Sequence, residues 1–183
     1  MNEPAGGAPI NGAAHVERPP CLVLGMGNLL LEDEGLGIHA LNILLQRFEL
    51  PAEVECLDGG TSGMALIDDI GGREHLVVLD AVQTGDPPGT LVTLRGGEVP
   101  VYFGVKVTPH QLGLSDVLAH LELTRERPGS VSVLGLVPVS MEMSLQPSEQ
   151  ISAGLDGLVE AAVEELAAMG YPLQPKAGSG AGQ

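Results

Sequence analysis

Short apolar runs alternate with helical patterns of apolar residues along most of this chain. Four runs predict buried strands, at Cys21–Met26, 54–57, 76–79 and 130–137. The segment 90–94 nearly alternates between apolar and polar side chains, which is typical of an antiparallel edge strand. The pattern therefore predicts five strands.

Between these strands, apolar residues recur at helical spacing. They predict long helices around 41–48, 114–121 and 151–166 and a short helix at 64–70, while 95–108 is interpreted as a long connection. Strands that alternate with helices favour a parallel or mostly parallel sheet with helices on both faces. In such sheets, ligands bind beyond the carboxyl ends of the strands.

Both ends of the chain differ in composition from its middle. Residues 1–20 and 174–183 are rich in Ala, Gly, Pro, Ser and Gln, so we predict two disordered tails. Residues 21–173 form a single predicted domain, because 183 residues supply one continuous core and no linker interrupts them. No exposed apolar repeat suggests an oligomer, and we expect a monomer.

The charge of the chain excludes several classes of partner. Eight Lys and Arg residues against 24 Asp and Glu residues give a net charge of −16 at pH 7, which repels nucleic acid. Neither a signal-peptide pattern nor an apolar run of membrane-spanning length is found, so we expect a cytoplasmic protein without membrane contact. Cys21 and Cys56 are predicted to be buried core residues in a reducing compartment.

The first loop, GMGNLLLEDEGLG, follows a strand with a Gly-x-Gly sequence that also occurs in dinucleotide-binding proteins. That fingerprint needs a third glycine three residues after the second, where this chain has Leu30. The acids Glu32, Asp33 and Glu34 then follow, and they would repel a pyrophosphate. A nucleotide-binding domain is therefore disfavoured. Asp33 and Glu34 also stand before a predicted helix, where carboxylates favour the positive end of the helix dipole.

Three residues on the ligand-binding edge of the predicted sheet could hold a metal. Glu34 and His110 stand at helix starts, and Asp80 directly follows an apolar strand. Thr108 and Pro109 are a good helix start, where the dipole favours the neutral imidazole that binds metals. Taken singly, Asp80 could serve in a turn and His110 could be an ordinary helix residue. Together, two carboxylates and one imidazole form an open site suited to Zn, Ni, Co or Mn.

Other catalytic groups have little support in the sequence. The chain contains neither a Gly-x-Ser-x-Gly elbow nor a His-Glu-x-x-His motif, and no histidine motif accompanies either cysteine. These absences disfavour a serine or cysteine hydrolase and a standard zinc peptidase. His39 is predicted to lie on the surface of its helix.

Four segments in this order resemble the maturation endopeptidases of nickel–iron hydrogenases: GMGNLLLEDEGLG, LDGGTSGMALIDDI, HLVVLDAV and VTPHQLGLSDVL. The resemblance continues through VSVLGLVPVSMEMSLQPS and covers roughly residues 21–170. It implies a three-layer α/β/α fold with a five-stranded mostly parallel sheet that has one antiparallel strand. It also implies that the metal-binding residues of the family are Glu34, Asp80 and His110.

The resemblance further implies a reaction and a partner. The expected substrate is the nickel-loaded precursor of a hydrogenase large subunit, whose C-terminal extension is removed by one cut. Nickel is expected to come with the substrate, and other divalent cations could substitute.

The mechanism implied by the resemblance stays open between two chemistries. Glu34 and Asp80 are the expected catalytic residues, which could activate water as in an aspartyl-type protease, or the metal could polarise the scissile carbonyl. Gly59, Gly60 and Thr61 could line the substrate channel or form a plain strand–helix turn. The alternative function is a maturation factor that binds metal and precursor without cutting.

Overall fold

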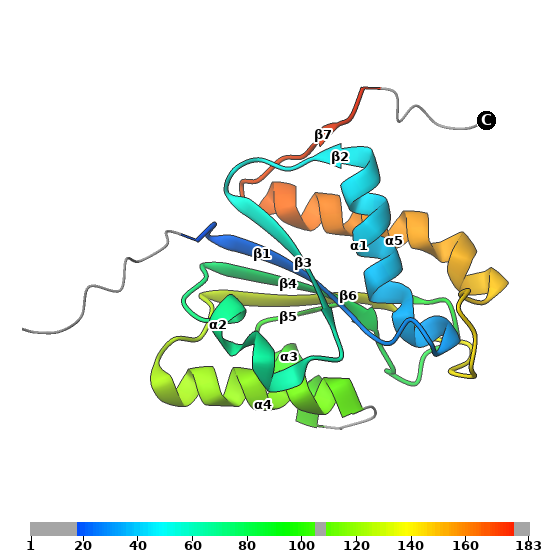
Figure 1. Cartoon of the computed structure of the whole chain (residues 1–183), viewed down its shortest axis with the longest axis horizontal. Helices are drawn as coiled ribbons and strands as arrows, with labels where there is room; N and C mark the ends of the chain where they lie inside the picture. The colour runs from blue at the N-terminus through cyan, green and yellow to red at the C-terminus, as the bar shows by residue number, and fades with distance from the viewer. Residues whose placement is uncertain (1–17, 105–108, 178–183) are drawn as a thin grey trace, which may run out of the picture.

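A five-stranded sheet in the order β3-β1-β4-β6-β5 forms the centre of the molecule (Figure 1). The computed structural model describes the backbone of residues 18–104 and 109–177, and their side chains except those of 103–112. The strands are β1 (Cys21–Met26), β3 (Val54–Gly60), β4 (His75–Ala81), β5 (Leu91–Arg95) and β6 (Ser130–Leu136). Four of them run parallel, and β5 pairs antiparallel with β6 at one edge. The predicted sheet is confirmed.

Helices cover both faces of this sheet, so the predicted three-layer α/β/α fold is also confirmed (Figure 1). One face carries α1 (Leu36–Arg47) and α5 (Glu149–Ala168). The other carries η2 (Gly63–Leu66), α2 (Ile67–Ile70), α3 (Glu98–Gly104) and α4 (Pro109–Thr124). Alternation along a strand sends Val23 into the first core and Leu22 into the second. No helix in the described residues combines the length and apolarity needed to cross a bilayer.

The region between β5 and α4 differs from its predicted form. A connection was expected over 95–108, but α3 occupies Glu98–Gly104. Val99 is 1% exposed in the second core, and Tyr102 packs against that core. A seven-residue helix with two such anchors is too short to show a helical period in the sequence, so packing against the core determines it.

The boundaries of α1 and of the domain are fixed by a small second sheet. Phe48 was expected in the helix, but β2 (Phe48–Glu49) is extended and pairs antiparallel with β7 (Gln174–Pro175). The backbone N–H of Lys176 donates to the carbonyl oxygen of Arg47 at 2.8 Å. Two residues that composition places in the C-terminal tail therefore pair with the body of the protein, and a third, Lys176, hydrogen-bonds to it. Residues 1–17 and 178–183 of the predicted tails lie outside the described part.

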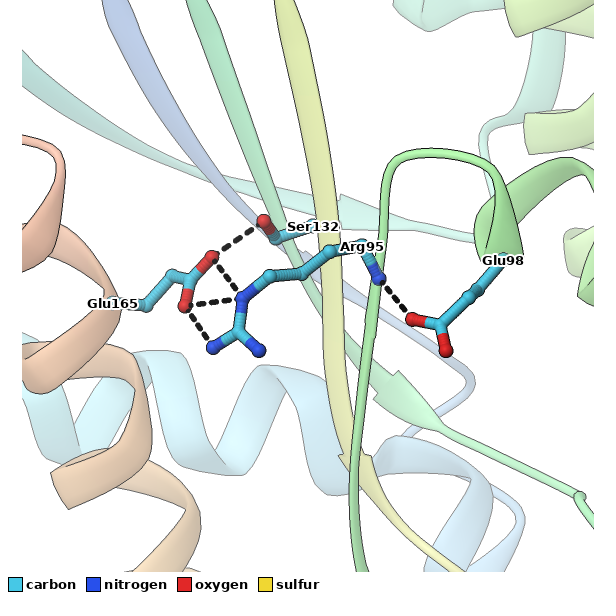
Figure 2. A network of polar contacts seen from close by, with 4 residues as sticks. All are labelled: Arg95, Glu98, Ser132 and Glu165. Carbon is cyan, nitrogen blue, oxygen red and sulfur yellow. Dashed lines mark hydrogen bonds and ion pairs between the residues drawn. The ribbon is translucent and has the colours of Figure 1, made fainter.

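The edge strand β5 is fastened to α5 by a polar network (Figure 2). Arg95 donates from Nε to both carboxylate oxygens of Glu165 at 3.0 Å, and the Ser132 hydroxyl donates to Glu165 Oε1 at 2.6 Å. The hydrogen bond from Arg95 is the main cause that lowers the pKa of Glu165. Glu165 is only 6% exposed, so this ion pair satisfies a carboxylate that burial alone would destabilise.

Candidate active site

Glu34 is held at the carboxyl end of the sheet by a short turn of helix. It lies in η1 (Glu32–Gly35), which runs directly into α1, and its side chain is 5% exposed. Its backbone N–H donates to the carbonyl oxygen of Leu31 at 2.7 Å. The residue was predicted at a helix start, and the structure places it in the turn before α1.

The first turn of α1 lies directly on the ends of two strands. A Cβ added at Gly37 would lie 2.0 Å from the carbonyl oxygen of Leu79 on β4 and 2.5 Å from that of Met26 on β1. Only a glycine permits this approach of backbone to backbone. Gly37 follows Glu34 by three residues and Leu79 precedes Asp80, so the packing brings the segments that carry both carboxylates into one corner.

Asp80 is the next-to-last residue of β4, and its side chain is completely buried. One carboxylate oxygen accepts a hydrogen bond from the backbone N–H of Ala81 at 2.8 Å. Its strand lies between β1 and β6, and Asp80 pairs with Gly135. Two buried carboxylates, Glu34 and Asp80, thus belong to the edge of the sheet where ligands bind in this fold class.

His110 is the second residue of α4, which begins at Pro109 as the sequence predicted. The side chain of His110 and all of Thr108 lie outside the described residues. The start of α4 is positioned by a glycine pair, because a Cβ at Gly113 would lie 2.6 Å from the Cα of Gly63 in η2. Among the described residues, no three His, Cys, Asp or Glu side chains are grouped to hold a metal. The metal trio with His110 therefore stays a prediction.

The predicted substrate-binding residues lie at the end of β3. The strand continues to Gly60, so Gly59 and Gly60 are strand residues where a loop was expected. The longer strand is explained by its partner, because Met26 of β1 still pairs with Gly60 after a shift of register. Thr61 follows in an exposed turn. Their role in binding substrate stays a prediction.

Asp33 has a structural role that the sequence did not predict. Its carboxylate is completely buried and accepts hydrogen bonds from the backbone N–H groups of Val139 at 2.9 Å, Ser140 at 3.1 Å and Ser148 at 2.7 Å. The Ser148 hydroxyl donates a fourth bond at 3.0 Å. This carboxylate joins η1 to the loop after β6. All its partners lie more than 100 residues away, so the local sequence contains no signal for them.

Two further side chains differ from their predictions. His39 was expected on the surface of its helix, but it is half-buried, its Nε2 has no hydrogen-bond partner among the described residues, and burial lowers its pKa. Cys56 was expected in the core, but it is half-buried at the edge strand β3, while Cys21 is fully buried as predicted. Burial raises the thiol pKa to about 11 for Cys21 and about 12 for Cys56, which makes both poor nucleophiles.

Comparisons with known proteins show the family of this chain. A family model described as hydrogenase maturation protease matches residues 38–165. The chain is 44% identical over 148 residues to the hydrogenase 2 maturation protease of Escherichia coli K12, which covers 80% of this chain and 88% of that protein. It is 40% identical over 153 residues to the hydrogenase expression/formation protein HupD of Rhodobacter capsulatus, over 81% of this chain and 72% of that one.

A solved structure gives the same result for the fold. The hydrogenase maturating endopeptidase HybD from Escherichia coli aligns with a TM-score of 0.82 and 41% identity, over 85% of this chain and 97% of that chain. A likeness of this extent in sequence and fold also disfavours a role limited to binding. The chain belongs to the hydrogenase maturation proteases, and it is a peptide-bond hydrolase.

Proposed function

We propose that this protease cuts the large-subunit precursor of a nickel–iron hydrogenase once and releases its C-terminal extension. Glu34, Asp80 and His110 would surround the scissile bond, and nickel would come with the precursor. The observation that carries the proposal is the placement of two carboxylates, 5% and 0% exposed, at the carboxyl end of the sheet in a chain of this family. Gly59, Gly60 and Thr61, at the end of β3, would line the path of the extension.

The two carboxylates suit the activation of water. A carboxylate that is shielded from solvent interacts strongly with nearby charge and can accept a proton from water as the water attacks the scissile carbonyl. Either Glu34 or Asp80 would be this base, which makes the mechanism aspartyl-type, and the proton would leave with the amine of the released extension. The other carboxylate would then help to position the substrate.

The same groups suit a metal ion that arrives bound to the substrate. Two carboxylates and one imidazole leave coordination positions open, which ligands from the precursor would fill. An ion shared in this way contributes affinity only when the precursor is loaded. The protease would therefore distinguish loaded from empty precursor by a difference in binding free energy.

The test is to incubate the purified protein with nickel-loaded and nickel-free precursor and to measure the intact mass of the precursor chain. We expect the loaded precursor to lose the mass of a C-terminal peptide and the empty precursor to stay whole. Asp80→Asn and His110→Ala are expected to slow this loss by at least about a hundredfold. If no preparation of the precursor loses mass, the proposal fails.

Matched controls keep the result specific to these residues. His120 is an exposed histidine on the same helix as His110, and Asp68 is an exposed aspartate in α2. His120→Ala and Asp68→Asn should process precursor at the rate of the unmodified protein. Normal processing by a folded His110→Ala variant would contradict the assignment of His110.

A further inference from the structure

An apolar surface stands beside the candidate active site. Among the described residues, nine large apolar side chains are exposed, and five of them come from two loops. Leu29 and Leu30 follow β1, and Val139, Met143 and Leu145 follow β6. Exposed large apolar side chains that gather in one place mark interaction surfaces more often than isolated ones do.

The two loops lie side by side and bring three of these residues together. Leu31 and Ser144 pair as an isolated parallel bridge, in which the N–H of Ser144 donates to the carbonyl oxygen of Leu30 at 3.2 Å. Leu30 precedes the bridged Leu31, and Met143 and Leu145 stand on either side of the bridged Ser144, so the bridge brings these three residues together. They are 60%, 87% and 65% exposed. We call these three residues the apolar patch.

The patch is built on loops that the structure holds firmly. The buried Asp33 carboxylate, in the same turn as Glu34, binds the N–H groups of Val139 and Ser140 just before Met143. A surface that is ordered before a partner arrives loses little conformational entropy on binding. Apolar side chains that such ordered loops expose to water are therefore suited to docking.

The position of the patch identifies what it would meet. Leu30 precedes Glu34 by four residues, and its loop follows β1, while Met143 and Leu145 lie in the loop that follows β6. In the sheet, β4 with Asp80 lies between these two strands. A protein chain that brings a peptide bond to Glu34 and Asp80 must approach the edge of the sheet that these loops form.

Charge around the patch adds a second requirement for the partner. Glu142 is exposed within the same loop, Glu149 is exposed at the start of α5, and the whole chain has a net charge of −16. A second copy of this acidic chain would be repelled. A partner that offers apolar side chains flanked by Lys or Arg would be attracted.

We propose that the apolar patch is the docking surface for the large-subunit precursor, which would cover it with apolar side chains flanked by basic ones close to the cut. This inference rests on the proposed function, because it names a contact of the same substrate. The patch contributes affinity for the folded precursor and leaves the chemical step to the carboxylates. Its loss should therefore raise KM and leave kcat nearly unchanged.

The test compares two double variants of the full chain on nickel-loaded precursor. Met143→Gln with Leu145→Gln keeps side-chain size and removes apolar character from the patch. Val101→Thr with Leu123→Gln is the matched control, because these residues are 72% and 85% exposed on α3 and α4. We expect the patch variant to raise KM at least about tenfold with kcat within about twofold of the unmodified protein, and the control to change neither.

The outcomes separate this inference from the proposed function. An unchanged KM in the patch variant, while the unmodified protein processes normally, overturns the docking surface and leaves the protease assignment intact. If the unmodified protein cuts no precursor, the proposed function fails. Calorimetric titration of precursor into both variants still measures how much the patch contributes to binding affinity. Sedimentation that shows a dimer only when the patch is intact, together with an unchanged KM, would assign it to self-association and overturn the proposal.

Discussion

The two ends of the sheet are held by buried charges of opposite sign. At the amino end, Arg73 is 4% exposed and donates hydrogen bonds to the carbonyl oxygens of Asp69 and Pro19 and to the carboxylate of Glu55. At the carboxyl end, Asp33 is completely buried and accepts bonds from backbone N–H groups. A cation collects acceptors at one end, and an anion collects donors at the other.

The difference between the ends lies in what each charge holds in place. Arg73 connects segments that enter the sheet, and no residue of the candidate active site is among its partners. Asp33 is the neighbour of Glu34 and fixes the loop that carries two of the three residues of the apolar patch. We infer that both charges support folding and that only the anion also supports function.

The largest expected effects come from deleting these two charges. Asp33→Ala should lower the free energy of unfolding by about 3–5 kcal/mol, because three backbone donors and a hydroxyl lose their acceptor. Arg73→Ala should lower it by about 2–3 kcal/mol, because Glu55 is part-exposed and stays solvated. Urea unfolding measures both values.

Processing of precursor then distinguishes the two variants. At a temperature where both are folded, Asp33→Ala should process precursor at least about tenfold more slowly, because Glu34 and the loop after β6 shift. Arg73→Ala should retain the normal rate. A folded Arg73→Ala variant without activity would show that the two ends do not differ in function.

The next effect tests how closely α1 packs on the carboxyl end. Gly37→Ala places a methyl group about 2 Å from the Leu79 carbonyl oxygen. We therefore expect the free energy of unfolding to fall by about 3 kcal/mol and the precursor to be processed more slowly. Gly157→Ala is the matched control in another helix, because nothing lies within 4 Å of its added Cβ. There the better helix propensity of Ala should stabilise the protein by up to about 1 kcal/mol. Equal thermal shifts in both variants would contradict the packing argument.

The sequence predicted those parts of the molecule that depend on local pattern. Apolar runs reproduced β1 and the other buried strands, because parallel strands are buried on both faces. The bridge between Leu31 and Ser144 and the buried Asp33 escaped prediction, because each joins loops more than 100 residues apart. For the candidate site, the structure has Glu34 and Asp80 at the edge of the sheet where the sequence predicted them, since strand ends mark that edge. The loops that surround them come from long-range hydrogen bonds.

A smaller effect is expected at the side edge of the sheet, where Arg95 binds Glu165. Glu165→Gln should lower the free energy of unfolding by about 1 kcal/mol at pH 7. The effect is small because the Arg95 side chain is exposed and solvent screens its charge. The pKa of Glu165 is lowered in the folded protein, so the stability from this carboxylate is present above its unfolded pKa and is lost as pH falls through the folded one. Urea midpoints from pH 7 to 3 should therefore converge for the variant and the unmodified protein.

An exposed neighbour provides the control for this pH dependence. Glu164 precedes Glu165 on α5 and is exposed. Glu164→Gln should leave the midpoint almost unchanged at every pH. If the urea midpoints of Glu165→Gln and the unmodified protein differ by a constant amount down to pH 3, neutral hydrogen bonding, and not charge, holds β5 to α5.

The smallest effect concerns His39, five residues after Glu34. Burial lowers its pKa below 6.5, so the unfolded chain takes up a proton before the folded chain does, and stability falls as pH drops below 6.5. His39→Leu removes this proton uptake and a buried nitrogen without a hydrogen-bond partner among the described residues. We expect the free energy of unfolding to increase by less than about 1 kcal/mol, and this increase should grow from pH 8 to pH 5. His120→Leu, at an exposed position, should show no such growth, and a gain from His39→Leu that is independent of pH would show that packing alone is responsible.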